Sequence, residues 1–257
     1  LKDIRGDYKD ENGVGRNRLR RWEKSDFRPR QDDIFQERLY AIQWMSGRDL
    51  SEGKKNPLFW FSSPSSHDLR REDIVSEYIE RNLSNWQDSG LVPDMAIEPG
   101  YNTTQPIRER GWTYWHHLYG PRHLLINAIA TKHAKSLPFM NIGLACLYDR
   151  SARTNRWHSR EMNVEQTFDD QVINTLLNYG SRGWRHAAPN LNLPERVEKF
   201  PEKSWIIKNC VSSEVSECTD IFLTDPPYAD AVNYDEITEY FIAWLRKNPP
   251  VPFNQWL

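Results

Sequence analysis

The sequence predicts an α/β fold in which a small sheet-bearing unit follows a larger, mainly helical region. Two short β-branched runs near the C-terminus, "SWIIKNCV" (204–211) and "DIFLT" (220–224), are typical of buried strands. A tight proline-containing turn and then an amphipathic helical pattern over 233–248 follow the second run. We therefore divide the chain into a mainly helical region, residues 1–187, and part of an α/β core, residues 188–257.

The composition argues against a membrane-spanning chain and against a disulfide framework. Hydrophobic residues make up 38% of the 257 residues, and no apolar run approaches the roughly 18 residues of a membrane span. No signal-peptide pattern opens the sequence. The three cysteines are expected to be free thiols, so we expect a soluble protein of a reducing cytoplasm. Because Leu1 is not an initiator methionine, we expect the numbering to begin inside a longer chain.

Apolar spacing and turn residues predict the elements of the first half. In chain order these are an irregular charged segment over 1–30, a helix over 32–45, a strand within 55–66, a helix over 67–90 and an extended or looped segment over 91–111. Asp32 or Asp33 is the expected N-cap of the first helix. Gly90 is well placed to end the second.

The same signals predict the elements of the second half. They are a helix over 121–137, a strand over 140–150, a helix over 163–180, a linker over 188–202 and the two strands already described. Asn233 is expected to cap the last helix together with Glu236, three residues further on. Its apolar stripe consists of Ile237, Tyr240, Phe241, Trp244 and Leu245.

The turn between the last strand and the last helix reads Asp225-Pro226-Pro227-Tyr228, and its residues suit methyl transfer to an exocyclic amine of a nucleobase. The Asp225 carboxylate and the Pro226 carbonyl can each accept one N–H of the amine, which directs the nitrogen lone pair at a methyl donor. Pro227 stiffens the turn and carries no competing N–H, and such preorganisation is a source of rate. Tyr228 offers a face on which an extruded base can stack. The alternative is a plain β-turn with a core tyrosine.

The middle of the chain is basic and aromatic, which is the composition of a nucleic-acid groove. Residues 101–160 hold nine Lys or Arg and five His against two acids, although the net charge of the chain is −2. Arginine side chains bind phosphate groups, and aromatic rings stack on unpaired bases. The expected nucleic-acid contacts are Arg108, Arg110, Trp115, His116, Arg122, Arg153 and Arg156.

Other interpretations of this segment stay open. Trp112, Trp115 and Leu118 have the spacing of core residues, and the arginines also suit a solvated face or internal ion pairs. Neighbouring histidines such as His116 and His117 point apart on a helix, so we expect no metal site.

Several segments together resemble the large adenine-specific DNA methylases of the DUF1156 type. They are "RPRQDDIFQERLYAIQWM", "EPGYNTTQPIRERGWTYWHHLYGPRHLL", "DIFLTDPPY" and "TDPPYADAVNYDEITEYFIAWLRK", in the same order as in that family, and they span residues 28 to 247. The resemblance implies a Rossmann-like methyltransferase core with S-adenosylmethionine as donor and N6 of adenine in double-stranded DNA as acceptor. It also implies that the mainly helical region is a target-binding insertion.

The resemblance further implies a prokaryotic restriction or phage-defence system, with other subunits such as a helicase or an ATPase as partners. N4-cytosine chemistry uses the same turn, so these residues leave both acceptors open. The glycine-rich D-P-F-x-G-x-G turn that holds the donor in such enzymes does not occur among the twelve glycines of the sequence, and the family's paired zinc-ribbon cysteines are also missing. We expect the donor-binding half in a longer chain. The alternatives are a split enzyme completed by a partner chain, or a DNA-binding or scaffolding subunit without catalysis.

Overall fold

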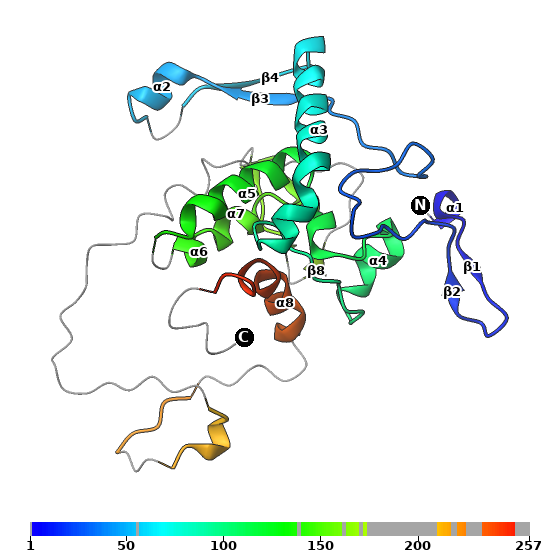
Figure 1. The fold of residues 1–257 in the computed structure, drawn as a ribbon, viewed down its shortest axis with the longest axis vertical. Coiled ribbons are helices and arrows are strands. Elements are labelled where there is room, and N and C mark those ends of the chain that lie inside the picture. Colours follow the sequence, from blue (N-terminus) through cyan, green and yellow to red (C-terminus); the bar gives the residue numbers. More distant parts are fainter. Residues whose placement is uncertain are drawn as a thin grey trace.

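The computed structural model shows a body of packed helices from which two hairpins extend (Figure 1). It describes residues 2–54, 57–137, 140–160, 163–169, 172–173, 210–216, 220–224 and 233–249. In Figure 1 the long helix α3 stands beside α5 and α7, while α8 lies below them. The body is therefore assembled from segments that are far apart in the sequence.

Helices carry most of the described structure. They are α1 (Lys2–Arg5), α2 (Gly47–Ser51), α3 (Ser66–Asp88), α4 (Thr104–Arg110), α5 (Pro121–Ala134), α6 (Met140–Gly143), α7 (Ala145–Asp149) and α8 (Tyr234–Leu245), with short 3-10 turns η1 (Trp115–Leu118) and η4 (Ser212–Glu214). The longest, α3, begins with reciprocal capping between Ser65 and Asp68. It is followed by Gly90 at φ 71°, a left-handed conformation that glycine adopts at low cost. Helix α5 begins at Pro121, where the missing N–H is not needed.

The described strands form four separate two-stranded antiparallel ribbons. Their members are β1 (Tyr8–Lys9) with β2 (Gly15–Arg16), β3 (Ile42–Met45) with β4 (Phe59–Ser62), β5 (Trp157–His158) with β6 (Asn163–Val164), and β7 (Phe168–Asp169) with β8 (Val172–Ile173). In the β3–β4 ribbon Trp44 lies opposite Trp60. This ribbon carries α2 at its tip and extends away from the helices in Figure 1. The described residues thus form a mixed α/β structure with short sheets.

One aromatic-rich core holds the body together. Its buried side chains come from α3, η1, α5, α7, α8 and the loops around Trp22 and Val92. The middle of α8 contributes Tyr240 and Trp244, and η1 contributes Trp115 and Leu118. Because these rings are large, their burial is the main source of stability in this part of the chain.

Several expectations are confirmed. The helices expected over 67–90 and 121–137 are α3 and α5, the expected strand within 55–66 contains β4, and α8 is the expected last helix. In the apolar stripe predicted for α8, Tyr240 and Trp244 are buried, and Ile237 and Phe241 pack against the core. The core alternative for Trp112, Trp115 and Leu118 is also confirmed.

The helix expected over 32–45 is wrong. Residues 42–45 are instead strand β3, paired with β4 through aromatic and β-branched side chains. The carboxylate of Asp33, an expected N-cap, accepts two hydrogen bonds of 2.7 Å from the Arg20 guanidinium. That tertiary ion pair holds the preceding residues in a turn, so no helix begins there.

The strand expected over 140–150 is also wrong, because this segment forms α6 and α7. Leu144, Leu147 and Tyr148 follow the i, i+3, i+4 spacing of one helical face, and all three are buried against the core. The expectation of a looped segment over 91–111 fails at α4. Pro106 is accommodated there because it stands in the first turn, where its missing N–H has no intrahelical acceptor.

The other corrections concern sheets. The described part of the helix expected over 163–180 contains β6, β7 and β8, and Phe168 enters the core. Residues 220–224 are not assigned to a strand, and Leu223 is 97% exposed. Residues 174–209, which include the expected linker and the domain boundary at 187/188, lie outside the described residues.

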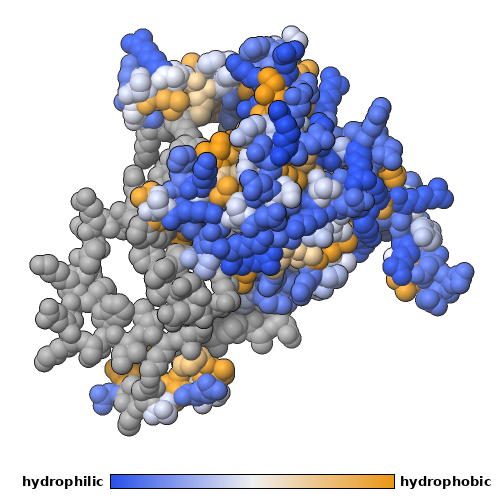
Figure 2. All heavy atoms as spheres, viewed as in Figure 1, coloured by the Kyte–Doolittle hydropathy of each residue, from blue (hydrophilic) through white to orange (hydrophobic). Residues whose placement is uncertain are grey.

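The face of the molecule seen in Figure 2 is mostly hydrophilic, interrupted by small hydrophobic groups. Among the described helices, none combines the length and the apolar composition needed to cross a membrane.

Candidate nucleic-acid interface

The predicted Asp225-Pro226-Pro227-Tyr228 turn lies outside the described residues. The helix on its C-terminal side is described, because α8 begins at Tyr234, six residues after Tyr228.

A hydrogen-bonded aromatic cluster fixes α8 on the body. The Tyr240 hydroxyl donates to the backbone oxygen of Tyr148 at 2.7 Å and accepts from the Tyr119 hydroxyl. The Trp244 indole N–H donates to the same Tyr119 hydroxyl at 3.0 Å. Burial raises the pKa of Tyr240 and of Tyr119, so both phenols stay neutral donors. A buried polar network that is satisfied in this way specifies one position of the helix.

The first turn of α8 is held by Glu236. Its carboxylate accepts hydrogen bonds from the backbone N–H groups of Tyr101 and Asn102, the second at 2.7 Å. Two successive N–H groups that converge on one anion form a backbone nest. Gly100 completes it, because a Cβ at this position would overlap the Glu236 carboxylate. The expected capping partnership with Asn233 is therefore wrong, since the Asn233 side chain makes no cap hydrogen bond.

Three of the predicted nucleic-acid contacts lie inside the core. Trp115, His116 and Arg153 are 1%, 0% and 1% exposed. Arg153 forms an ion pair with Glu37 at 2.6 Å and donates to the Phe27 carbonyl at 2.9 Å. Side chains this deeply buried offer no surface to a base or a phosphate in this conformation. Their position supports a structural role in place of the predicted contact.

Two adjacent histidines, His116 and His117, join η1 to the loop that contains residues 23–26. His117 Nδ1 accepts from the N–H groups of Thr113 and Tyr114 at 3.1 and 3.2 Å, so its proton lies on Nε2, which donates to the Glu23 carbonyl at 2.9 Å. Burial lowers the pKa of His117 well below the ordinary value and that of His116 to about 4. Both rings are therefore neutral structural groups at pH 7.

The other predicted arginines lie at or near the surface. Arg108 is 3.5 Å from Glu109, Arg122 donates to Glu72 and Arg156 is 2.7 Å from Asp169. These side chains are partly exposed, and exposed ion pairs of this kind exchange readily with solvent ions. DNA contact by Arg108, Arg122 and Arg156 stays a prediction.

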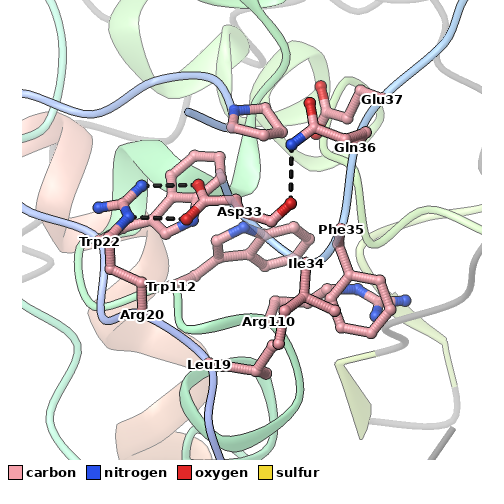
Figure 3. A pocket seen from close by; sticks show the side chains of 11 residues that line it. Leu19, Arg20, Trp22, Asp33, Ile34, Phe35, Gln36, Glu37, Arg110 and Trp112 are labelled. Carbon is pink, nitrogen blue, oxygen red and sulfur yellow. Dashed lines mark hydrogen bonds and ion pairs between the residues drawn. The ribbon is translucent and has the colours of Figure 1, made fainter. Parts of the chain in front are cut away.

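Arg110 and the buried Trp112 belong to a small cavity of about 60 Å³ (Figure 3). The Arg110 guanidinium lies over the Phe35 ring, 4.5 Å from its centroid. On the other side of the cavity Arg20 faces Asp33, whose backbone oxygen accepts from Gln36 at 2.8 Å. The volume suits a few water molecules, and the polar groups that line it already bind one another.

The structure brings together three cations that the sequence analysis did not select. Lys24, Arg246 and Lys247 all form ion pairs with the Asp94 carboxylate, at 3.3 Å for Lys24 and 2.8 Å for Lys247. Partial burial opposes ionisation, but the hydrogen bonds from Lys247 and Arg246 outweigh it and lower the pKa of Asp94 to about 2. In the sequence, the adjacent Arg246 and Lys247 at the end of the last helix are the signal that could have indicated this cluster. Lys24 carries no such signal, because it precedes Arg246 by 222 positions.

Comparison of the chain with protein-family models, with curated proteins and with solved structures gave no match. Within the part of the chain that the structure describes, no three His, Cys, Asp or Glu residues are grouped as metal ligands.

Proposed function

We propose that this chain supplies the acceptor side of an S-adenosylmethionine-dependent DNA methyltransferase that modifies N6 of adenine. The observation that carries the proposal is the sequence Asp225-Pro226-Pro227-Tyr228, followed six residues after Tyr228 by a helix whose first turn is anchored to the body. In this role the Asp225 carboxylate and the Pro226 carbonyl accept the two N–H groups of the target amine. Tyr228 stacks on the extruded base.

The anchoring of α8 supports this role because a catalytic turn must be held firmly. Glu236 fixes the first turn of the helix, and Tyr240 and Trp244 fix its middle. A displacement of about 1 Å in a group that orients a substrate can cost a hundredfold in rate. In this proposal α8, which begins six residues after Tyr228, supplies a fixed element on the C-terminal side of the turn.

The sequence contains no glycine-rich turn of the kind that holds S-adenosylmethionine, so residues 1–257 supply no recognisable donor site of that kind. In this proposal the donor is bound by a further segment or by a partner chain. The biological setting is a prokaryotic restriction or phage-defence system.

The test is transfer of a tritiated methyl group to adenine-containing duplex DNA, with the full-length protein compared with Asp225→Ala. We expect labelled N6-methyladenine with the wild type and its loss in the variant, while donor binding persists. Transfer that survives Asp225→Ala unchanged contradicts the assigned role. Labelled N4-methylcytosine instead identifies the cytosine enzyme, and DNA binding without donor binding or transfer identifies the scaffolding alternative.

A further inference from the structure

An open cleft of about 680 Å³ lies on the side of the body formed by three backbone segments. Residues 21–24 form one wall, Ala96, Ile97 and Pro99 form another, and the third includes Ile107 and Tyr114. Hydrogen bonds tie the walls together, from the Ile97 N–H to the Thr113 carbonyl at 2.8 Å and from the Trp22 N–H to the Gly111 carbonyl at 2.8 Å. The cleft is therefore a fixed feature of the fold, and its volume lies within the range of ligand sites.

One wall carries positive charge that is not neutralised locally. Arg21 is exposed and donates to the Ile107 carbonyl, and it forms no ion pair with any residue that the structure describes. Partial desolvation, followed by the neighbouring Arg16, lowers the pKa of Arg21.

The second cation of this wall, Lys24, shares its anion with two others. Asp94 is the common ion-pair partner of Lys24, Arg246 and Lys247, so this group of four has a net charge of +2. The acid within the wall, Glu23, is 2.9 Å from Arg30.

The opposing charges nearby belong to α8 and to Glu98, which lies between the lining residues Ile97 and Pro99. Glu239 lies close to Glu98 and Asp235, and burial followed by these two carboxylates raises its pKa. The positive excess is therefore confined to the wall that contains Arg21 and Lys24 and to the C-terminal end of α8.

The remaining lining is apolar and aromatic. Ile97, Pro99 and Ile107 line the cleft together with the ring of Tyr114. Cations at the edge of a cleft suit phosphates, and an aromatic ring over an apolar floor suits the face of an unpaired base.

We propose that this cleft binds a single nucleic-acid strand, with Arg21 and Lys24 on successive phosphates and Tyr114 against a base. The identity of the nucleic acid as DNA rests on the proposed function. The cleft itself is a separate site, built from residues that the structure describes. Asp225 to Tyr228 play no part in it.

The test measures binding of a fluorescent single-stranded oligothymidylate to the full-length protein by anisotropy over a range of NaCl concentrations. Each phosphate contact on a single strand contributes about 0.7 to the slope of log K against log salt. We expect Arg21→Gln/Lys24→Gln to reduce the magnitude of the slope by about 1.4 and to weaken binding roughly 25-fold at 0.1 M salt.

Two further variants make the result specific. Arg48→Gln is the matched control, because Arg48 is a surface arginine that is paired with Glu52 and lies outside the cleft. It should keep the wild-type slope. Tyr114→Leu should weaken binding at least about fivefold and leave the slope unchanged, since it removes stacking and no charge. Thermal unfolding checks that each variant is folded. If the double variant is not, Lys24→Gln alone should reduce the slope by about 0.7.

Wild-type slope and affinity in the double variant would overturn the proposal, as would an equal loss in Arg48→Gln or no binding by the wild type. The assay contains no methyl donor, so it separates the two hypotheses. Cleft-dependent binding without methyl transfer refutes the proposed function alone. Methyl transfer by a protein whose cleft variants bind normally refutes the cleft alone.

Discussion

The ring of Tyr148 lies flat against the indole of Trp244, with centroids 4.1 Å apart and an angle of 6° between the planes. Tyr148 belongs to α7 and Trp244 to α8, so this stack joins the basic middle of the chain to the helix after the Asp-Pro-Pro-Tyr turn. The position of α8 is therefore coupled to the core, and substitutions far from α8 in the sequence should alter it.

Trp244→Ala should destabilise the protein by about 3–5 kcal/mol, because it leaves a large cavity and removes the hydrogen bond to Tyr119. Urea unfolding followed by circular dichroism measures this change. Trp60→Ala is the matched control. Trp60 is exposed on the β3–β4 ribbon, so its removal should cost under about 1 kcal/mol. Equal losses in the two variants would show that α8 is not docked as described.

Glu236→Gln should loosen the first turn of α8, because an amide accepts the N–H groups of Tyr101 and Asn102 more weakly than a carboxylate. The expected loss of stability is about 1 kcal/mol. In the methyl-transfer assay we expect kcat to fall with little change in the KM for DNA.

Gly100→Ala should reproduce this effect by displacing the Glu236 carboxylate. The neighbouring Asp235→Asn serves as control, because Asp235 is exposed on the same turn of α8. A Glu236→Gln variant that matches Asp235→Asn in both stability and kcat would contradict the anchoring role.

Arg153→Ala should cost about 3–5 kcal/mol, because it removes the partner of Glu37 and leaves the His117 and Phe27 carbonyls without their donor. Arg153→Lys should recover little of this loss, since a single ammonium cannot reproduce the guanidinium fork. Arg156→Ala, which removes a partly exposed ion pair with Asp169, should change stability by under about 1 kcal/mol. If Arg153 acts mainly on DNA, Arg153→Ala will instead unfold like the wild type and bind DNA more weakly.

The stability of the protein should fall on acidification between about pH 6.5 and pH 4, because the buried His116 and the half-buried His123 are desolvated. Burial lowers the pKa of His116 and of His123 from 6.5 to about 4 in the folded state. The unfolded chain therefore binds these protons first, and the stabilisation is complete above pH 6.5 and is lost as the pH falls. Each histidine contributes at most about 1.4 kcal/mol per pH unit in this window.

Urea unfolding at pH 7 and pH 5 measures this dependence. His67→Gln should leave it unchanged, because His67 is exposed at the start of α3. His117→Gln should make it shallower, since protonated His117 would set an N–H against the N–H groups of Thr113 and Tyr114. Equal stability at the two pH values would rule out neutral buried histidines.

The elements whose signals are local can be predicted from the sequence alone. Capping residues, a 3.6-residue apolar period and terminal glycines or prolines mark α3, α5 and α8, and their packing in the core agrees with that pattern. The proposed catalytic turn is likewise a local signal, four adjacent residues between a hydrophobic run and a helix.

The pairing of polar groups depends on the tertiary fold, because ion pairs and burial join residues that are distant in the sequence. From the sequence, Arg153 was expected to contact nucleic acid. In the fold, its guanidinium is bound by Glu37 and by three backbone carbonyls. Residues 42–45 had a helical period, but β4 supplied a strand partner. The excess charge of Lys24, Arg246 and Lys247 exists only because the fold places all three around one carboxylate, Asp94.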